Sequence, residues 1–171
     1  MESALPGHDV AKLVEEHYEL LYRYAYRLSG SAADAEDLAQ QTFLIAQSHR
    51  DQLRDIDHAR GWLCTILRHA FLKSRHDHGG IVNLSLESVA EPADAEIEEA
   101  LVDSHELQAA LLELPEEFRS VIVLFYFGDF SYKAIAEQLD VPIGTVMSRL
   151  ARGKAWLRKR LSACQASNFR D

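Results

Sequence analysis

Apolar residues recur at every third or fourth position along most of this 171-residue chain, which is the spacing of one face of an α-helix. In the first half the spacing predicts three helices, over about residues 10–29, 32–50 and 58–75. The stretch SGSA separates the first two helices, and either Ser31 or Asp34 is expected to cap the second. These helices predict one N-terminal helical domain.

Helical spacing resumes near residue 97 and continues to Leu114. A strongly apolar helix is predicted to start at Pro115, because proline is favoured in the first turn of a helix. The stretch GDFS ends that helix, and Ser131 is expected to cap a short helix over residues 132–139. The second half of the chain is therefore also predicted to be helical.

A tight turn, VPIG, follows the short helix and leads into a last helix that runs to about Leu161. Thr145 is expected to cap this last helix. Ala136 and Gly144 are small residues, and we expect them to allow the two helices to cross closely, as in a helix-turn-helix.

No strand-like alternation persists anywhere, so the predicted fold class is all-α. Residues 8–80 and 105–163 are expected to form two small helical domains, the second of which contains the helix-turn-helix. Residues 81–104 have the composition of a flexible acidic linker.

Charge is distributed unevenly along the chain, whose net charge is −9. Residues 81–117 carry eleven acidic groups and no Lys or Arg, whereas residues 118–171 carry nine basic and four acidic groups. The C-terminal third is therefore a basic module attached to an acidic segment, and a basic helical module points to nucleic acid.

No apolar run is long enough to span a membrane, and the N-terminus does not have the pattern of a secretory signal. We therefore expect a cytoplasmic location without membrane insertion. In that compartment Cys64 and Cys164 are expected to be thiols rather than a disulfide.

The last helix has six Lys or Arg between residues 144 and 160 and no acidic residue. On a helical wheel, Val146, Leu150, Gly153, Leu157 and Leu161 share one side, and we expect that side to pack in the core. The wheel places Ser148, Arg152, Ala155 and Lys159 on the opposite, outward side. In a helix-turn-helix the first turns of the second helix enter the major groove. The residues expected to read base edges are Thr145, Met147, Ser148, Ala151 and Arg152.

The remaining basic residues of this helix are better placed to bind phosphates, which give affinity but no sequence information. They are Arg149, Lys154, Arg158, Lys159 and Arg160. An amphipathic helix with a basic solvent face, without DNA binding, remains the alternative for this pattern.

Two segments carry a resemblance to a known family. The stretch from LLELPEEFRSVIVLFYF to the end of the last helix resembles region four of bacterial sigma factors of the extracytoplasmic-function group. DAEDLAQQTFLIAQ, together with GWLCTILRHAFLKSR, resembles region two of the same family. Both halves occur in the family's order, and together they cover roughly residues 10–80 and 105–161.

This resemblance implies a subunit that binds core RNA polymerase, recognises the −35 and −10 promoter elements and helps to open the duplex. An anti-sigma protein is implied as a further partner. The resemblance also implies that the acidic linker occupies a polymerase channel, and plain disorder of the linker stays open as the alternative. The residues implied for polymerase binding lie on the second helix; they are Asp34, Glu36, Asp37, Gln40, Gln41 and Phe43.

The −10 element is implied to contact the loop over residues 48–60 and the third helix. Trp62 matches a tryptophan of the family, although its spacing with Ile66 and Leu67 favours a place in the core over a stacking platform. The residues implied for −10 binding are Arg54, Arg60, Trp62, Arg68, His69, Lys73 and Arg75.

Two positions depart from the family pattern. Met147 stands where a basic residue is frequent, and methionine has no donor for guanine, so readout of the −35 element is altered there. His69 stands where asparagine is usual, which affects the −10 contacts. These departures concern the promoter sequence and leave the class of function unchanged.

Other chemistry has little support in the sequence. Cys64, His69, His76 and His78 are close together but lack the spacing of a zinc site, so no metal is expected. No nucleophile motif, phosphate-binding loop or dinucleotide turn occurs, so no enzymatic activity, cofactor or small-molecule substrate is expected.

Two other functions remain open at this point. A stand-alone helix-turn-helix regulator would bind duplex DNA without polymerase. A sigma mimic would titrate an anti-sigma protein and bind no promoter.

Overall fold

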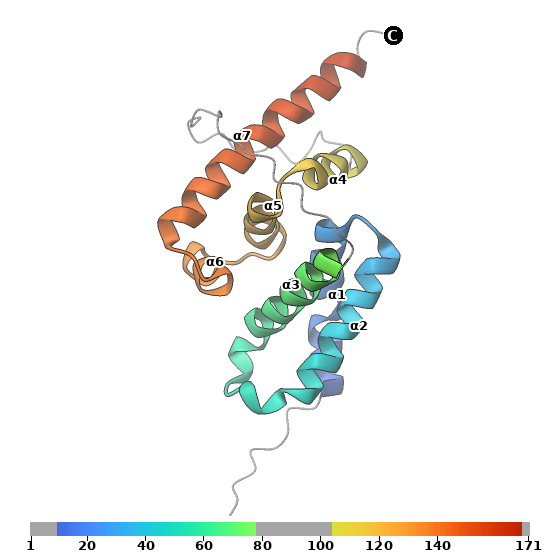
Figure 1. Cartoon of the computed structure of the whole chain (residues 1–171), viewed down its shortest axis with the longest axis vertical. Helices are drawn as coiled ribbons and strands as arrows, with labels where there is room; N and C mark the ends of the chain where they lie inside the picture. Colours follow the sequence, from blue (N-terminus) through green and yellow to red (C-terminus); the bar gives the residue numbers. More distant parts are fainter. Residues whose placement is uncertain (1–9, 78–103, 169–171) are drawn as a thin grey trace, which may run out of the picture. The chain divides into compact units, whose positions relative to one another are not determined.

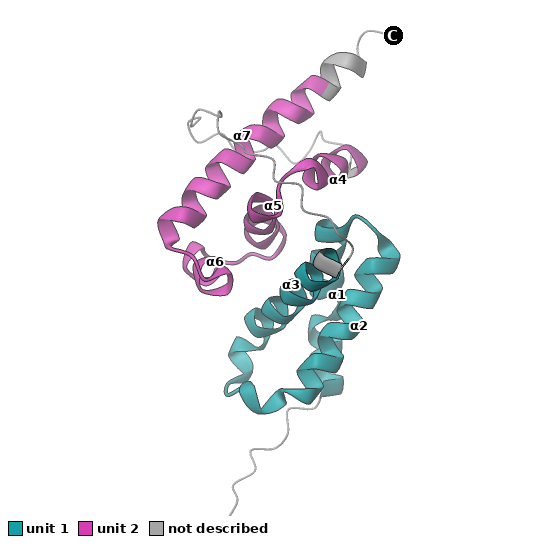
Figure 2. Cartoon of the chain, in the orientation of Figure 1, with its two compact units in different colours: residues 1–80 teal, residues 81–171 magenta. Residues whose placement is uncertain are grey.

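The computed structural model describes residues 10–77 and 104–168, all of the regular structure within these ranges being helical (Figure 1). The all-α fold class is therefore confirmed for this part of the chain. The chain divides into two compact units, residues 1–80 and residues 81–171 (Figure 2). The expected linker falls almost wholly outside the described residues, since the second unit is described from Ser104 onward.

The first unit is built from three long helices that pack against one another. They are α1 (Val10–Ser29), α2 (Ala32–Ser48) and α3 (Ala59–Asp77), and every pair of them is in contact. Two short 3₁₀ turns, η1 (Arg50–Gln52) and η2 (Ile56–His58), connect α2 to α3. The predicted helices are therefore present, with boundaries within two residues of those expected from the sequence.

The turn between α1 and α2 follows from its small polar residues. Gly30 has φ of 74°, a conformation that glycine adopts without strain, and its N–H donates to Tyr26 O at 2.8 Å to end α1. Ser31 then caps α2, because its hydroxyl accepts from Asp34 N at 3.2 Å. Of the two expected caps Ser31 is the correct one.

The core of the first unit alternates large residues with small ones. Leu21 and Leu28 of α1 and Leu63 and Leu67 of α3 are completely buried. Helix α2 contributes alanines to this core, such as Ala39, which let the other helices approach it closely. This packing fixes α2 and α3 as rigid supports for the polar residues on their outer surfaces.

The second unit surrounds the long C-terminal helix. Its helices are α4 (Ser104–Glu113), α5 (Glu116–Ile122), α6 (Tyr132–Leu139) and α7 (Ile143–Asn168), and α7 packs against the other three. A π-helical turn, η4 (Val123–Phe127), continues α5. Helix α6 has the bounds predicted for it, and Ser131 caps it by accepting from Ala134 N at 3.2 Å.

The turn between α6 and α7 is tighter than the sequence suggested. Asp140 ends α6 in the left-handed conformation, with φ of 51°, and α7 already begins at Ile143. Thr145 therefore lies inside the first turn of α7, where its N–H donates to Pro142 O at 2.9 Å, and its expected capping role is wrong.

Gly153, rather than Gly144, is the point of close helix approach. A Cβ on Gly153 would lie 2.6 Å from Ile122 Cδ1, whereas a Cβ on Gly144 would meet nothing within 4 Å beyond its own helix neighbours. The expectation for Gly144 is therefore wrong, and α5 approaches α7 at Gly153, about two and a half turns farther along.

Candidate nucleic-acid interface

One side of α7 packs into the core of the second unit as its helical wheel predicted. Val146, Leu150, Leu157 and Leu161 are all buried. Ala155 was expected to face outward but is buried as well. Helix α7 contacts α4 in addition to α5 and α6. The three neighbours cover a wider part of its surface than one apolar stripe, and Ala155 lies in this covered part.

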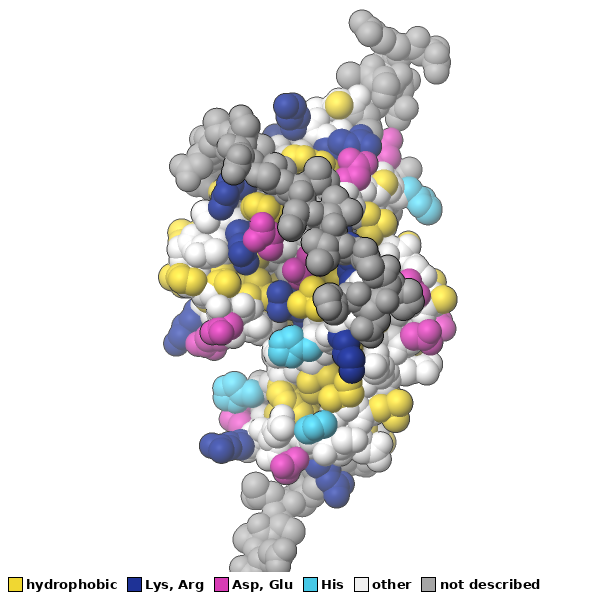
Figure 3. Space-filling model, viewed as in Figure 1, with side chains coloured by type: hydrophobic (Ala, Val, Ile, Leu, Met, Phe, Trp, Pro, Cys, Tyr) yellow, Lys and Arg dark blue, Asp and Glu magenta, His cyan; other side chains and the backbone are white. Residues whose placement is uncertain are grey.

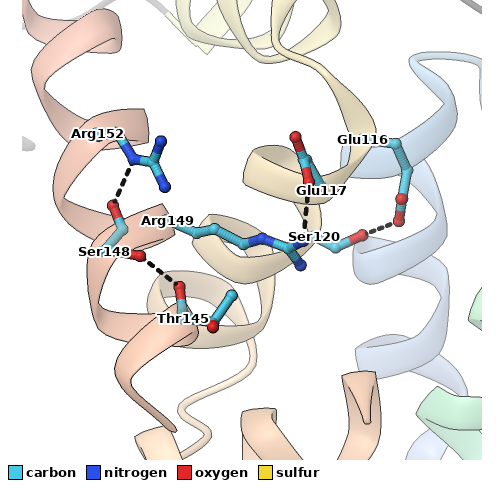
Figure 4. Close-up of polar contacts among 7 residues, drawn as sticks. All are labelled: Glu116, Glu117, Ser120, Thr145, Ser148, Arg149 and Arg152. Atoms are coloured by element: carbon cyan, nitrogen blue, oxygen red, sulfur yellow. Dashed lines mark hydrogen bonds and ion pairs between the residues drawn. The ribbon is translucent and has the colours of Figure 1, made fainter. Parts of the chain in front are cut away.

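Arg149 is held by a carboxylate of the same unit. Its guanidinium donates from Nη2 to Glu117 Oε2 at 2.8 Å, which joins α7 to α5 (Figure 4). A free phosphate-binding role was expected for Arg149. In this structure the side chain is instead paired, and a phosphate would have to compete with Glu117 for it.

Arg152 also turns toward α5 instead of outward. Its Cζ lies 5.5 Å from the centre of the Phe118 ring, and the side chain is half-buried. Its Nε donates to Ser148 O at 3.4 Å, and Ser148 donates from its hydroxyl to Thr145 O at 3.0 Å (Figure 4). The outward position that the wheel assigned to Arg152 is therefore wrong.

The exposed end of α7 is apolar. Ile143 and Met147 keep 49% and 51% of their surface in solvent, and Gly144 between them is also exposed. Thr145, Ser148 and Ala151 are half-buried. Of the residues expected to read bases, Met147 is thus the most accessible.

The later turns of α7 carry the basic residues expected to bind phosphate. Lys159 is exposed, while Lys154 and Arg158 are half-buried. Arg160 forms a bidentate ion pair with Glu113 of α4: its Nε donates to Oε2 at 2.8 Å and its Nη2 donates to Oε1 at 2.7 Å. Figure 3 shows Lys and Arg side chains along the visible part of α7, with acidic side chains among them.

Arg160 also affects the titration of its partner. Its hydrogen bonds hold the pKa of the Glu113 carboxyl below its ordinary value, against a smaller opposing effect of burial. Glu113 and Glu117 therefore each neutralise one arginine of α7, and the basic surface is smaller than the sequence count indicates.

Helix α2 presents a polar outer face. Five of the residues expected to bind polymerase are exposed on it; they are Asp34, Glu36, Asp37, Gln40 and Gln41. Phe43 is different, because it is only 7% exposed and stacks on Tyr18, with ring centres 6.5 Å apart. Its side chain therefore supports α2 from within and does not form part of the outer face.

Leu44 was missed by the sequence reasoning. It follows Gln40 and Gln41 on α2 and is 65% exposed, the largest exposure of any large apolar side chain in the described part of the chain. The sequence did not indicate that Leu44 is exposed, because a leucine at helical spacing in an amphipathic helix is usually a core residue.

The residues expected to meet the −10 element are spread along α3 and the loop before it. Arg54 is exposed in that loop, and His69 and Lys73 are exposed one turn apart on α3. Arg60 and Trp62 at the start of α3 are half-buried, so Trp62 is neither a core residue nor an open stacking platform.

Two further arginines of this set lie along α3. Arg68 is half-buried, and Arg75 is half-buried with its Cζ 5.8 Å from the centre of the Phe71 ring. Together with Lys73 they make the accessible part of α3 basic, which suits a nucleic-acid backbone.

Of the four residues weighed as metal ligands, His78 lies outside the described residues, and the side chain of His76 is not described either. No group of three or more His, Cys, Asp or Glu within residues 10–77 and 104–168 has the arrangement needed to hold a metal ion. Cys64 is buried, and burial raises the pKa of its thiol to about 12. Among the described helices, none is both long and apolar enough for a membrane span.

Comparison with protein families assigns both units to one kind of protein. Residues 13–80 match the family model of sigma-70 region 2, and residues 104–157 match that of sigma-70 region 4. The two matches occur in the order proposed from the sequence.

Curated relatives agree with these matches. The ECF RNA polymerase sigma factor SigE of Mycolicibacterium smegmatis is 39% identical over 170 residues, covering 94% of this chain and 64% of that protein. The ECF RNA polymerase sigma factor SigW of Bacillus subtilis is 32% identical over 166 residues, covering 88% of each. The chain thus spans somewhat less than two thirds of the length of SigE.

A solved structure has a similar fold. The sigma factor RpoE from Bartonella quintana, crystallised with the anti-sigma factor NepR, matches with a TM-score of 0.73 and 27% identity, over 90% of this chain and 97% of that one. The helical fold and its two units define a sigma-70-like protein. This chain belongs to the ECF group of RNA polymerase sigma factors.

Proposed function

We propose that this sigma factor binds core RNA polymerase and directs it to promoters through separate contacts of its two units. The observation that carries this proposal is the pairing of region 2 and region 4, in order, on one chain. A stand-alone regulator needs only the helix-turn-helix, and its function gives no reason for the first unit.

Polymerase binding is assigned to the outer face of α2. Asp34, Asp37 and Gln41 are exposed there and supply carboxylate and amide groups for a basic partner surface. We add Leu44 to this face, because an exposed leucine among polar residues provides the apolar contact that protein interfaces bury at their centre. Phe43 is assigned a supporting role from within.

Contact with the −10 element is assigned to α3 and the preceding loop. His69 and Lys73 are exposed on one face of α3 and can meet the backbone and bases of a DNA strand. Trp62 is half-buried, so only one side of its ring is available to a base. The histidine has two ring nitrogens and can donate to a base edge from either tautomer.

Contact with the −35 element is assigned to α7. The first turns of the second helix of a helix-turn-helix enter the major groove, and this places Met147 and Ser148 near base edges. Lys154, Arg158 and Lys159 lie farther along the helix and are assigned to phosphates. Arg149 joins them when Glu117 releases it.

Regulation by an anti-sigma protein is proposed by similarity to RpoE, whose solved structure contains one. The reaction chemistry would belong to the polymerase, and this chain would act as a non-enzymatic initiation factor in the cytoplasm. A sigma mimic that only titrates an anti-sigma protein would not need the basic turns of α7.

The test of this proposal separates polymerase binding from promoter binding. Asp37→Ala is expected to weaken the complex with core polymerase on every promoter, whereas Lys159→Ala is expected to leave that complex intact and weaken promoter binding. Glu15→Ala, at an exposed position of α1 outside every assigned site, is a charge-matched control for the first variant. Equal core binding by Asp37→Ala and wild type would contradict the assignment of α2.

A further inference from the structure

We propose that Ile143 and Met147 form an apolar reading edge on α7 that selects a thymine through its 5-methyl group. This inference rests on the proposed role of α7 at the −35 element and names the chemistry of its readout. It makes Met147 a residue that determines promoter sequence, in place of the hydrogen-bonding contact that a basic residue would make there.

The two side chains lie together at the end of α7 that enters the groove. They are four residues apart, so they are neighbours on one face of the helix. Among the described side chains of α7, they are the two large apolar residues that remain exposed. Apolar surface at this end of a basic helix-turn-helix is available for contact with the base-pair edges.

The surface around this edge is open. Gly144 lies between the two residues, is exposed, and has no neighbour within 4 Å of the position of a Cβ beyond its own helix. A glycine at such a place allows another molecule to approach the backbone closely. DNA could therefore reach Met147 without displacing a side chain of this unit.

Thr145 lies on the other side of the helix from Ile143 and Met147. Thr145 and Met147 are separated by about 200° around the axis. Ser148 donates to Thr145 O, and Arg149 turns toward Glu117 of α5 (Figure 4). Arg152 turns toward Phe118 of the same helix. Ile143 and Met147 themselves carry no hydrogen-bond donor, and Lys154, which shares their face, lies about two turns beyond Met147.

Base chemistry then selects the ligand. Thymine is the base whose methyl group projects into the major groove, whereas guanine, adenine and cytosine present polar atoms there. A thioether or aliphatic chain against those polar atoms would desolvate them without a hydrogen bond, which is unfavourable. A thymine methyl against Met147 instead removes apolar surface of both partners from water.

Replacement of thymine by deoxyuridine tests this directly, because it removes only the methyl group. The holoenzyme of this chain and core polymerase first selects sites from a duplex library that is randomised over the promoter. Each thymine of the selected upstream block is then replaced singly by deoxyuridine. For wild type we expect one position at which affinity falls about fourfold, the effect of exposing one buried methyl-sized group.

Variants connect the effect to the reading edge. Met147→Ala is expected to bind the thymine and deoxyuridine duplexes equally, and Met147→Arg is expected to select guanine at that position. Leu112→Ala is the matched control, since Leu112 is an exposed apolar residue of α4, and it should keep the fourfold difference.

Two results would overturn the inference. One is an upstream block in which no deoxyuridine changes the affinity of wild type; the other is a thymine preference that survives in Met147→Ala combined with Ile143→Ala. If α7 does not bind the −35 element, the result is different: the holoenzyme then selects no upstream block from the library. That result would overturn both the assignment of α7 and this inference.

Discussion

Arg149 of α7 donates a 2.8 Å hydrogen bond to Glu117 of α5. This ion pair engages a guanidinium that the sequence alone assigns to a DNA phosphate. The two residues are 32 positions apart in the chain. Their pairing means that the affinity of α7 for DNA depends on an acid in the neighbouring helix.

Glu117→Gln should release Arg149 and strengthen binding of the protein to duplex DNA at low salt. One additional phosphate contact increases the slope of log affinity against log salt by about 0.9. Binding measured over a series of salt concentrations gives this slope.

Asp129→Asn is the control for this prediction, because it removes the same charge from an exposed site that does not hold Arg149. An equal change of slope in both variants would show that net charge, and not release of Arg149, is responsible.

The pair of Glu113 and Arg160 predicts a pH-dependent contribution to stability. The pKa of Glu113 is lowered in the folded state, so its contribution is complete above the unfolded value of 4.5 and is lost as pH falls through the lower folded value. Glu113→Gln should reduce the free energy of unfolding by about 0.5 kcal/mol at pH 7, the scale of an exposed ion pair. At pH 3 the difference from wild type should shrink.

Denaturant unfolding at the two pH values measures this difference. A cost of Glu113→Gln that is the same at both values would contradict an ionic origin.

Gly153→Ala should destabilise the second unit by about 1 kcal/mol, because the new Cβ would lie 2.6 Å from Ile122 Cδ1 in a filled core. The clash exceeds the gain in helix propensity from replacing glycine. Gly144→Ala meets no such neighbour and should stabilise the helix slightly.

A double variant identifies the clash. Ile122→Val removes Cδ1, so Gly153→Ala should cost less in that background than in wild type. If the effects of the two substitutions on the free energy of unfolding were additive, Ile122 Cδ1 would not be the atom that clashes with the new Cβ.

Cys64 should be unreactive in the folded protein. Burial raises the pKa of its thiol to about 12, and the thiolate is the reactive form. In a Cys164→Ser background, a thiol reagent at pH 8 should modify Cys64 only on the timescale of unfolding. Modification as fast as that of a free thiol would show that α3 opens around Cys64 in the native state.

The elements could be predicted from the sequence largely because their signals are local. Ser31 and Ser131 cap helices through hydrogen bonds that span three residues, and the wheel of α7 places Val146 and Leu157 correctly in the core. The π-helical turn at Val123–Phe127 was not predicted, because its residues have ordinary helical spacing.

The candidate site was harder to predict because its errors depend on distant partners. A wheel shows the direction of Arg152 but cannot show that Phe118 attracts it, nor that Glu117 lies opposite Arg149. Ala155 was misplaced for the same reason, since contact with a third helix is not encoded in the periodicity of α7. The sequence therefore predicts which helix meets DNA more accurately than which of its side chains are free to do so.

Run-off transcription with purified core polymerase and a promoter library tests the central claim most directly. Addition of this chain should produce transcripts from a defined set of promoters that share an upstream and a downstream element, and core polymerase alone should produce none. Tight binding to duplex DNA without polymerase, together with no specific transcript when polymerase is present, would contradict the function of a sigma factor.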